Sequence, residues 1–157
     1  MFRWSKSSQK ATEKSKGEFL IATGEDGGFP LILRLRSSFP EEVDRSGYGT
    51  LLAIHWDYEP LAGSGMPSQE DRLRMDHLVE LLVAALEPTK QSYLSAIVTC
   101  NGVKEWQWYT RDLEEAMSLI NSVLSGVAPF PVKISAEEDL DWEAYYGLLD
   151  SVKERDL

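Results

Sequence analysis

The stretch YLSAIVTCNGVKEWQWYT, residues 93–110, decides the fold. Two runs rich in β-branched and aromatic residues, 93–100 and 103–110, flank the dipeptide Asn101-Gly102. This dipeptide favours the tight reversal of a β-hairpin, because both of its residues accept positive φ angles. The sequence therefore predicts two antiparallel strands joined at Asn101 and Gly102.

The register of this hairpin follows from the faces that its side chains would share. A two-residue turn would set Val98 against Glu105, an apolar residue against a charged one. A three-residue loop with Gly102 in the left-handed conformation gathers apolar side chains on one face instead. The pairs in that register are Leu94 with Trp108 and Ala96 with Trp106. We therefore expect the three-residue loop.

Alternating patterns of strand and helix surround the hairpin. The predicted elements are a strand over 50–57, a helix begun by Ser68 and stopped by Pro88, the hairpin, a helix begun by Asp112 and stopped by Gly126, and an edge strand over 130–135. Strand, helix, strand, strand, helix, strand is the split βαβ order, in which right-handed crossovers place both helices on one face. This order predicts a ferredoxin-like βαββαβ two-layer sandwich over about residues 50–135.

Further elements flank this unit within an α+β fold. Two β-rich runs around the glycine cluster 24–28 predict an N-terminal β-hairpin, and the open sheet face is left either exposed or covered by that hairpin and the last helix. Asp141 is the expected cap of a C-terminal helix. Residues 1–17 are Ser- and Lys-rich, which is typical of a disordered basic tail. We expect a single domain over 18–157.

The charge of the chain limits its partners. The net charge is −10, and residues 1–16 hold five basic residues and one acid, a local +4 that leaves −14 on the rest. A body of this charge repels nucleic-acid phosphates and attracts basic surfaces. The expected partner is a basic or mixed-charge protein, not nucleic acid.

The compartment and the assembly follow from what the sequence lacks. There is one cysteine, Cys100, inside an apolar run, so no disulfide framework is predicted. No apolar run is long enough for a membrane span, and residues 1–17 lack the apolar core of a secretory signal. We expect a cytoplasmic protein without a membrane partner, monomeric or weakly dimeric through the edge strand 130–135.

His55 and Asp57 are the candidate pair for acid–base chemistry or metal binding. His55 and Asp57 lie two apart on a strand and so point to the same face, where a carboxylate can orient an imidazole for acid–base chemistry or metal binding. A third ligand would have to come from His77, Glu105 or Asp112, and nothing in the spacing selects one. The simpler interpretation is a polar strand face, with no catalytic residue, no metal and no cofactor.

Aromatic residues near the sheet suggest a binding surface. Trp106, Trp108 and Tyr109 would resemble the stacking platform of an RNA-binding sheet if they faced outward, but the preferred register turns both tryptophans inward. Acidic and aromatic side chains suit a protein partner better. The candidate surface residues are Glu105, Gln107, Tyr109, Asp141, Trp142 and Tyr145.

Several short motifs, spread over about residues 19–149, resemble the bacterial domain-of-unknown-function family 695. In chain order they are Ile54-His55-Trp56-Asp57-Tyr58, Gly65-Met66-Pro67, Val98-Thr99-Cys100-Asn101-Gly102, Glu105-Trp106-Gln107-Trp108-Tyr109-Thr110-Arg111-Asp112, and Asp141-Trp142 followed by Tyr145. The C-terminal motif departs from the family, which usually has proline after the aspartate where this chain has Leu140. The resemblance implies no catalytic residues.

A more distant resemblance is to the regulator of ribonuclease E activity, B type, a ferredoxin-like protein inhibitor. Together these observations favour a non-enzymatic, protein-binding regulatory or inhibitory module. The alternatives are an immunity-type inhibitor of a toxic enzyme, and a small metal-dependent or acid–base enzyme centred on His55 and Asp57.

Overall fold

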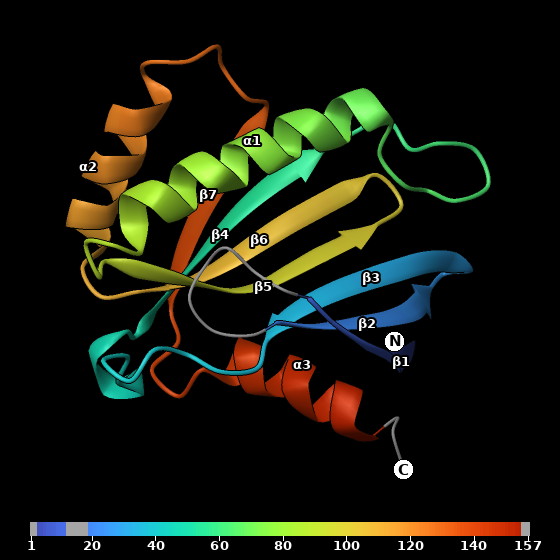
Figure 1. Cartoon of the computed structure of the whole chain (residues 1–157), viewed down its shortest axis with the longest axis horizontal. Helices are drawn as coiled ribbons and strands as arrows, with labels where there is room; N and C mark the ends of the chain where they lie inside the picture. The colour runs from blue at the N-terminus through green and yellow to red at the C-terminus, as the bar shows by residue number, and fades with distance from the viewer. Residues whose placement is uncertain (1–2, 12–18, 155–157) are drawn as a thin grey trace.

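The computed structural model describes the backbone of residues 3–11 and 19–154, and the side chains of residues 19–153. Within these residues seven strands form one antiparallel sheet in the order β1-β2-β3-β5-β6-β4-β7, with helices packed on it (Figure 1). The strands are β1 Arg3–Ala11, β2 Phe19–Asp26, β3 Phe29–Arg36, β4 Thr50–Asp57, β5 Ser92–Cys100, β6 Val103–Thr110 and β7 Val132–Glu138. The helices are α1 Gln69–Leu86, α2 Leu113–Leu124, α3 Glu143–Glu154 and the short 3-10 helix η1 Arg45–Gly47. The predicted α+β class, with its N-terminal hairpin and C-terminal helix, is confirmed.

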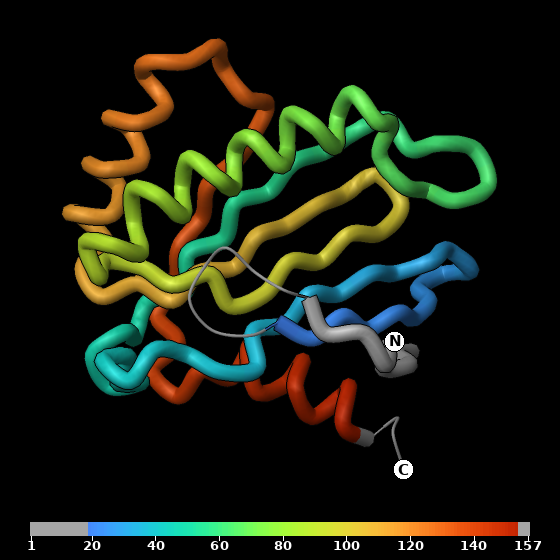
Figure 2. Tube along the Cα trace, viewed as in Figure 1, coloured from blue at the N-terminus to red at the C-terminus, as the bar shows by residue number. Residues whose placement is uncertain are grey.

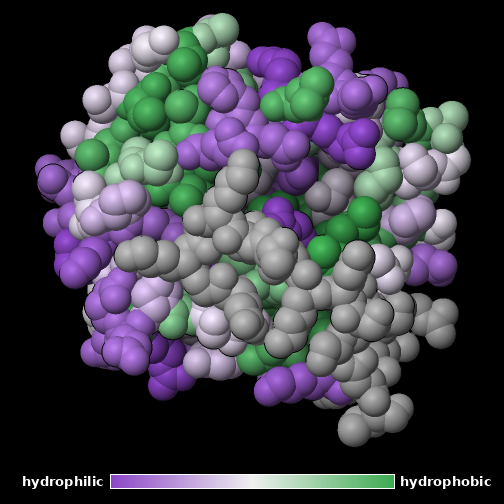
Figure 3. Space-filling view, in the orientation of Figure 1, coloured by the Kyte–Doolittle hydropathy of each residue, from purple (hydrophilic) through white to green (hydrophobic). Residues whose placement is uncertain are grey.

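Helices α1 and α2 begin where the sequence predicts. The hydroxyl of Ser68 accepts from the backbone N–H of Asp71, and the carboxylate of Asp112 accepts from that of Glu115. These bonds satisfy N–H groups that the first turn of a helix leaves without a partner. Both helices lie on the sheet face that carries Trp56, Trp106 and Trp108, the first face, and pack on it to form the larger core. Figure 3 shows apolar side chains gathered over α2 and the adjoining part of α1.

The N-terminal hairpin extends the sheet sideways. Strand β3 pairs with β5 over Leu31–Leu35, so that the β2–β3 hairpin runs beside the β5–β6 hairpin (Figure 2). The expectation that this hairpin could cover a sheet face is therefore wrong: it pairs with the edge of β5, whose backbone groups would otherwise face solvent. Helix α3 packs on the other face, the second face, where Tyr93, Tyr109 and Tyr145 belong to a second core.

The register of the central hairpin differs from the prediction. A two-residue turn pairs Cys100 with Val103, and Asn101 and Gly102 have φ angles of 35° and 91°. The disfavoured pairing of Val98 with Glu105 is present, and Ile97, not Ala96, lies opposite Trp106. A β-bulge at Ser95 then shifts the register, because its one extra residue restores the predicted pairing of Leu94 with Trp108.

Helix α3 has a different cap from the predicted one. The carboxylate of Asp139, not that of Asp141, accepts from the backbone N–H groups of Glu143 at 2.7 Å and Ala144 at 3.1 Å. Trp142, which lies between Asp139 and Glu143 in the chain, has a φ of 56°. This is a left-handed conformation, and the Trp142 ring lies in the second core. Asp141 is left exposed at the surface.

The two ends of the sheet are β1 and β7. Strand β7 is the edge strand that the prolines predict, although it starts at Val132 and runs three residues further than expected, to Glu138. Strand β1 lies within the predicted tail 1–17 and pairs with β2, while residues 1–2 and 12–18 lie outside the described residues. The disorder of the tail stays a prediction. None of the helices in the described part of the chain is long and apolar enough to cross a membrane.

Candidate functional site

A row of polar side chains crosses three neighbouring strands on the second face. His55 on β4 lies between Glu105 on β6 and Lys133 on β7, because all three occupy paired positions in the sheet. The Nε2 atom of His55 lies 2.9 Å from Oδ1 of Asp57, and its Nδ1 lies 3.5 Å from Oε1 of Glu105. Lys133 Nζ approaches the other oxygen of Asp57 at 3.9 Å. We call Lys133, Asp57, His55 and Glu105 the polar row.

The polar row keeps both ring nitrogens of His55 next to carboxylates. The carboxylate of Asp57 orients the ring through Nε2, and the carboxylate of Glu105 lies next to Nδ1. Each ring nitrogen therefore has a carboxylate as its neighbour. The other proposed third ligands are elsewhere: His77 on α1 lies 6.1 Å, between ring centroids, from Phe130, and Asp112 caps α2. Among the described residues no group of three or more His, Cys, Asp or Glu side chains is arranged to hold a metal ion.

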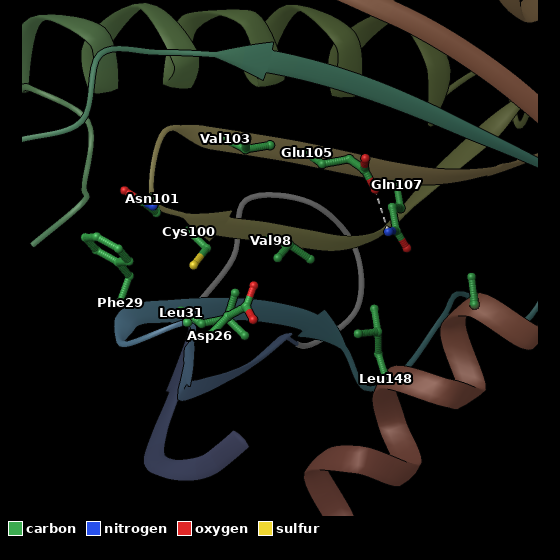
Figure 4. Close-up of a pocket in the computed structure, with 12 residues that line it drawn as sticks. Asp26, Phe29, Leu31, Val98, Cys100, Asn101, Val103, Glu105, Gln107 and Leu148 are labelled. Carbon is green, nitrogen blue, oxygen red and sulfur yellow. Dashed lines mark hydrogen bonds between the residues drawn. The ribbon is translucent and has the colours of Figure 1, made fainter. Parts of the chain in front are cut away.

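Beside the polar row the second face is hollowed into a cleft of about 710 Å³. Helix α3 covers only part of this face, and Leu148 on that helix closes one end of the hollow (Figure 4). The cleft is lined by Asp26, Gly27, Phe29, Leu31, Val98, Cys100, Asn101, Val103, Glu105, Gln107, Ala144 and Leu148. Its residues thus come from the β2–β3 hairpin, the β5–β6 hairpin and α3.

The cleft has an apolar floor and acidic side chains in its lining. Val98 and Val103 belong to the floor, and Asp26 and Glu105 are the charged side chains among the lining residues. Glu105 is held by Gln107, whose Nε2 donates to its Oε2 at 2.8 Å. Burial, and to a smaller extent the charge of Asp26, raise the pKa of the Cys100 thiol, which keeps it protonated and a poor nucleophile. This arrangement suits the binding of a positively charged group with an apolar neighbour.

The aromatic surface candidates lie in the interior. Tyr109 and Trp142 stack with ring centroids 4.1 Å apart, and Tyr145 packs edge-on against Trp142. The hydroxyl of Tyr109 donates to Asp139 at 2.7 Å and accepts from the backbone N–H of Tyr145 at 3.2 Å. All three side chains are buried, so they fix α3 to the sheet and leave Glu105 and Gln107 as the candidates that line the cleft.

Sequence reasoning missed most of the cleft. Asp26 and Phe29 lie in the predicted N-terminal hairpin, but the position of that hairpin beside β5 depends on a long-range pairing that the sequence pattern does not indicate. The two-residue turn is what brings Val98 and Cys100 onto the second face together with Glu105. The Asn101-Gly102 dipeptide was the available signal, since it favours that turn more strongly than a three-residue loop.

Comparisons with known proteins give one match. No curated protein and no solved structure matches the chain. A family described as a family of unknown function, DUF695, matches residues 21–149, a range that contains the lining residues of the cleft named above. The resemblance seen in the sequence motifs is confirmed, and the chain belongs to the DUF695 family.

Proposed function

We propose that this chain is a non-enzymatic binding module, and that the cleft on the second face receives a basic, partly apolar segment of a partner protein. One observation carries the proposal: the charged side chains lining the cleft, Asp26 and Glu105, are both acidic and stand above an apolar floor. A lysine or arginine of the partner would pair with these carboxylates, while a neighbouring aliphatic residue contacts Val98 and Val103.

The size and the surrounding charge of the cleft support this proposal. A hollow of about 710 Å³ lies within the range of ligand-sized pockets and has room for a few side chains. The chain carries a net charge of −10, which accelerates the encounter with a basic partner. Asp57 of the polar row adds a further carboxylate next to Glu105 and His55.

Acid–base catalysis at His55 and Asp57 has less support. Neither residue lines the cleft, so a substrate seated there would meet Glu105 before it met His55. Both ring nitrogens of His55 already face carboxylates, those of Asp57 and Glu105, and so are not turned toward a nucleophile that the imidazole could activate.

A ferredoxin-like assignment of β4 to β7 belongs to the same proposal. The order β5-β6-β4-β7, antiparallel throughout, with α1 and α2 packed on one face, supports it. An inhibitory role, including that of an immunity protein against a basic toxic enzyme, is the narrower form of the proposal. Both forms use the same acidic cleft.

The test uses a matched pair of double variants. Asp26→Asn with Glu105→Gln removes two charges from the cleft, and Glu80→Gln with Glu114→Gln removes two from exposed helix surface. Labelled peptides that alternate lysine and leucine, and acidic peptides of the same length, are titrated against each protein by fluorescence anisotropy. We expect the native chain and the control to bind the basic peptide with strong salt dependence, and the cleft variant to bind at least roughly tenfold more weakly.

Two results would overturn the proposal. Equal loss of binding in the cleft variant and the control would mean that only the overall charge matters. Equal binding of basic and acidic peptides would mean that the cleft has no charge preference. The variant pair can then be used to retrieve natural partners, keeping only proteins that the control retains and the cleft variant loses.

A further inference from the structure

A second hollow, on the opposite face of the sheet, has the opposite charge. Helix α1 lies over β4, β5 and β6 but leaves a groove of about 470 Å³ between its N-terminal half and strand β3. The groove is lined by Ile32, Arg34, Leu61, Met66, Pro67, Gln69, Arg72, Ile97, Thr99 and Lys104. The described residues that line it are all different from those that line the cleft on the second face.

Three basic side chains from three different elements meet at this groove. Arg34 comes from β3, Lys104 from β6 and Arg72 from the second turn of α1. Among the described residues that line the groove none is acidic, although the chain as a whole has 26 acidic against 16 basic residues. We call Arg34, Arg72, Lys104 and the groove between them the cationic groove.

Little in the described part of the chain neutralises this charge. Neither Arg72 nor Lys104 forms a salt bridge with any described residue, and the one carboxylate that acts on the group is that of the exposed Asp76. Arg34 has an interaction of its own, so the inference depends on Arg72 and Lys104. Lys104 also lies over the ring of Trp106, 5.5 Å from its centroid, which holds the ammonium group near the sheet.

The environment of Lys104 opposes its charge. Burial lowers the pKa of Lys104; Asp76 raises it, and Arg34 and Arg72 lower it again. Burial likewise lowers the pKa of Arg34, which Asp76 partly offsets. Arg34 and Lys104 are half-buried and Arg72 is exposed, so an anion in the groove would offset the partial desolvation of the first two and the repulsion among all three.

We propose that the cationic groove is a binding site for an anionic small molecule, whose oxyanion group lies between Arg72 and Lys104 and whose apolar part contacts Ile97 and Met66. Arginine binds phosphate and carboxylate oxygens with two parallel hydrogen bonds, and lysine adds a point charge. Ile97 and Met66 supply apolar surface beside the cations. The N-terminus of α1 adds little, because Glu70 and Asp71 already stand in its first turn.

The experiment uses the full chain and three defined probes: inorganic phosphate, phenyl phosphate and benzoate. Binding is followed by amide chemical-shift changes in two-dimensional NMR, which report where each probe lies. We expect saturable shifts at Thr99, Lys104 and Arg72, with phenyl phosphate binding more tightly than inorganic phosphate because its ring adds apolar contact. A ranking of phenyl phosphate above benzoate would identify phosphate as the preferred group, and the reverse ranking would identify carboxylate.

Variants separate a built site from general attraction. Lys104→Met and Arg72→Gln should each weaken binding by roughly tenfold or more, the usual effect of losing a charge-assisted hydrogen bond. Arg111→Gln, an exposed arginine away from the groove, is the matched control and should leave binding unchanged. The Asp26→Asn, Glu105→Gln double variant should also leave binding unchanged, so the two proposed sites can fail separately. Far-UV circular dichroism checks that each variant is folded.

Absence of saturable shifts up to roughly 10 mM of every probe would overturn the inference, since that concentration exceeds the dissociation constant of even a weak specific site. Equal weakening by Arg111→Gln and Arg72→Gln would also overturn it. In that case the anion would respond to the charge of the whole surface and not to the groove.

Discussion

The two faces of one sheet are covered very differently. Two helices pack on the first face over β4 to β7 and bury all three of its tryptophans, Trp56, Trp106 and Trp108. A single helix packs on the second face, fixed by Tyr109 and Tyr145, and leaves the cleft beside it. The same strands therefore serve a closed core on one side and an open surface on the other.

The difference can be read along a single strand. In β6 the side chains of Trp106 and Trp108 enter the first face and are buried, while the alternate residues Glu105 and Gln107 remain partly exposed on the second face. Alternation along a strand is what separates the two sets. In β6 the polar side chains thus lie where the helix leaves the sheet open to solvent.

Replacement of a first-face tryptophan should have the largest effect. Trp108 is fully buried beneath the helices, and Trp108→Ala would leave a cavity there. We expect a loss of about 3–5 kcal/mol in the free energy of unfolding, measured by denaturant titration. A loss below about 1 kcal/mol would show that the first face is less closely packed than the structure indicates.

High pH should act mainly on the second face. Burial raises the pKa of Tyr93, Tyr109 and Tyr145, that of Tyr145 to about 12. An unfolded tyrosine ionises near pH 10, so the stabilisation is fully present below about pH 10 and is lost as the pH rises toward about 12. For Tyr145 alone the loss is of the order of 2–3 kcal/mol.

Tyrosinate absorbance and far-UV circular dichroism, recorded together in a pH titration, test this expectation. Tyr58, which packs with the first-face core, also has a raised pKa, so one part of the signal is not from the second face. We expect most of the tyrosinate to appear with the loss of structure. Ionisation of all tyrosines near pH 10 in a still folded chain would contradict the burial of the second core.

The cap of α3 offers a comparison within four residues of chain. Asp139→Ala removes the acceptor for Glu143, Ala144 and the Tyr109 hydroxyl, and should cost about 1–2 kcal/mol of unfolding free energy. Asp141→Ala, the position that the sequence predicts as the cap, should change stability by less than about 0.5 kcal/mol. Thermal or denaturant unfolding measures both, and equal effects would contradict the assigned cap.

The polar row should matter least for stability. Its side chains are 32% to 83% exposed, and ion pairs at such positions contribute little. His55→Ala should change the free energy of unfolding by less than about 0.5 kcal/mol. A large loss would give the row a structural role and weaken its place beside a binding surface.

Local signals in the sequence predict most of the helices and strands. They do not predict which strands pair when the strands are far apart in the chain. Strands β4 and β6 have the predicted bounds, because alternation and turn residues are local properties. The position of β3 beside β5 depends on contacts between segments far apart in the chain, which alternation does not encode. The cleft could not be predicted without that pairing, and the cationic groove needs it as well, since Arg34 and Lys104 meet across β5.

The bulge at Ser95 has a consequence for the permitted length of the central hairpin. Near the turn Cys100 pairs with Val103, and at the far end Leu94 pairs with Trp108. These two pairs belong to registers that differ by one residue, and the extra residue at the bulge allows both in one hairpin. Insertion or deletion of a single residue between 93 and 110 would exchange the two faces on one side of the change, bringing Glu105 or Trp106 to the wrong side. Changes of two residues would preserve the faces, so this hairpin should tolerate even changes in length far better than odd ones.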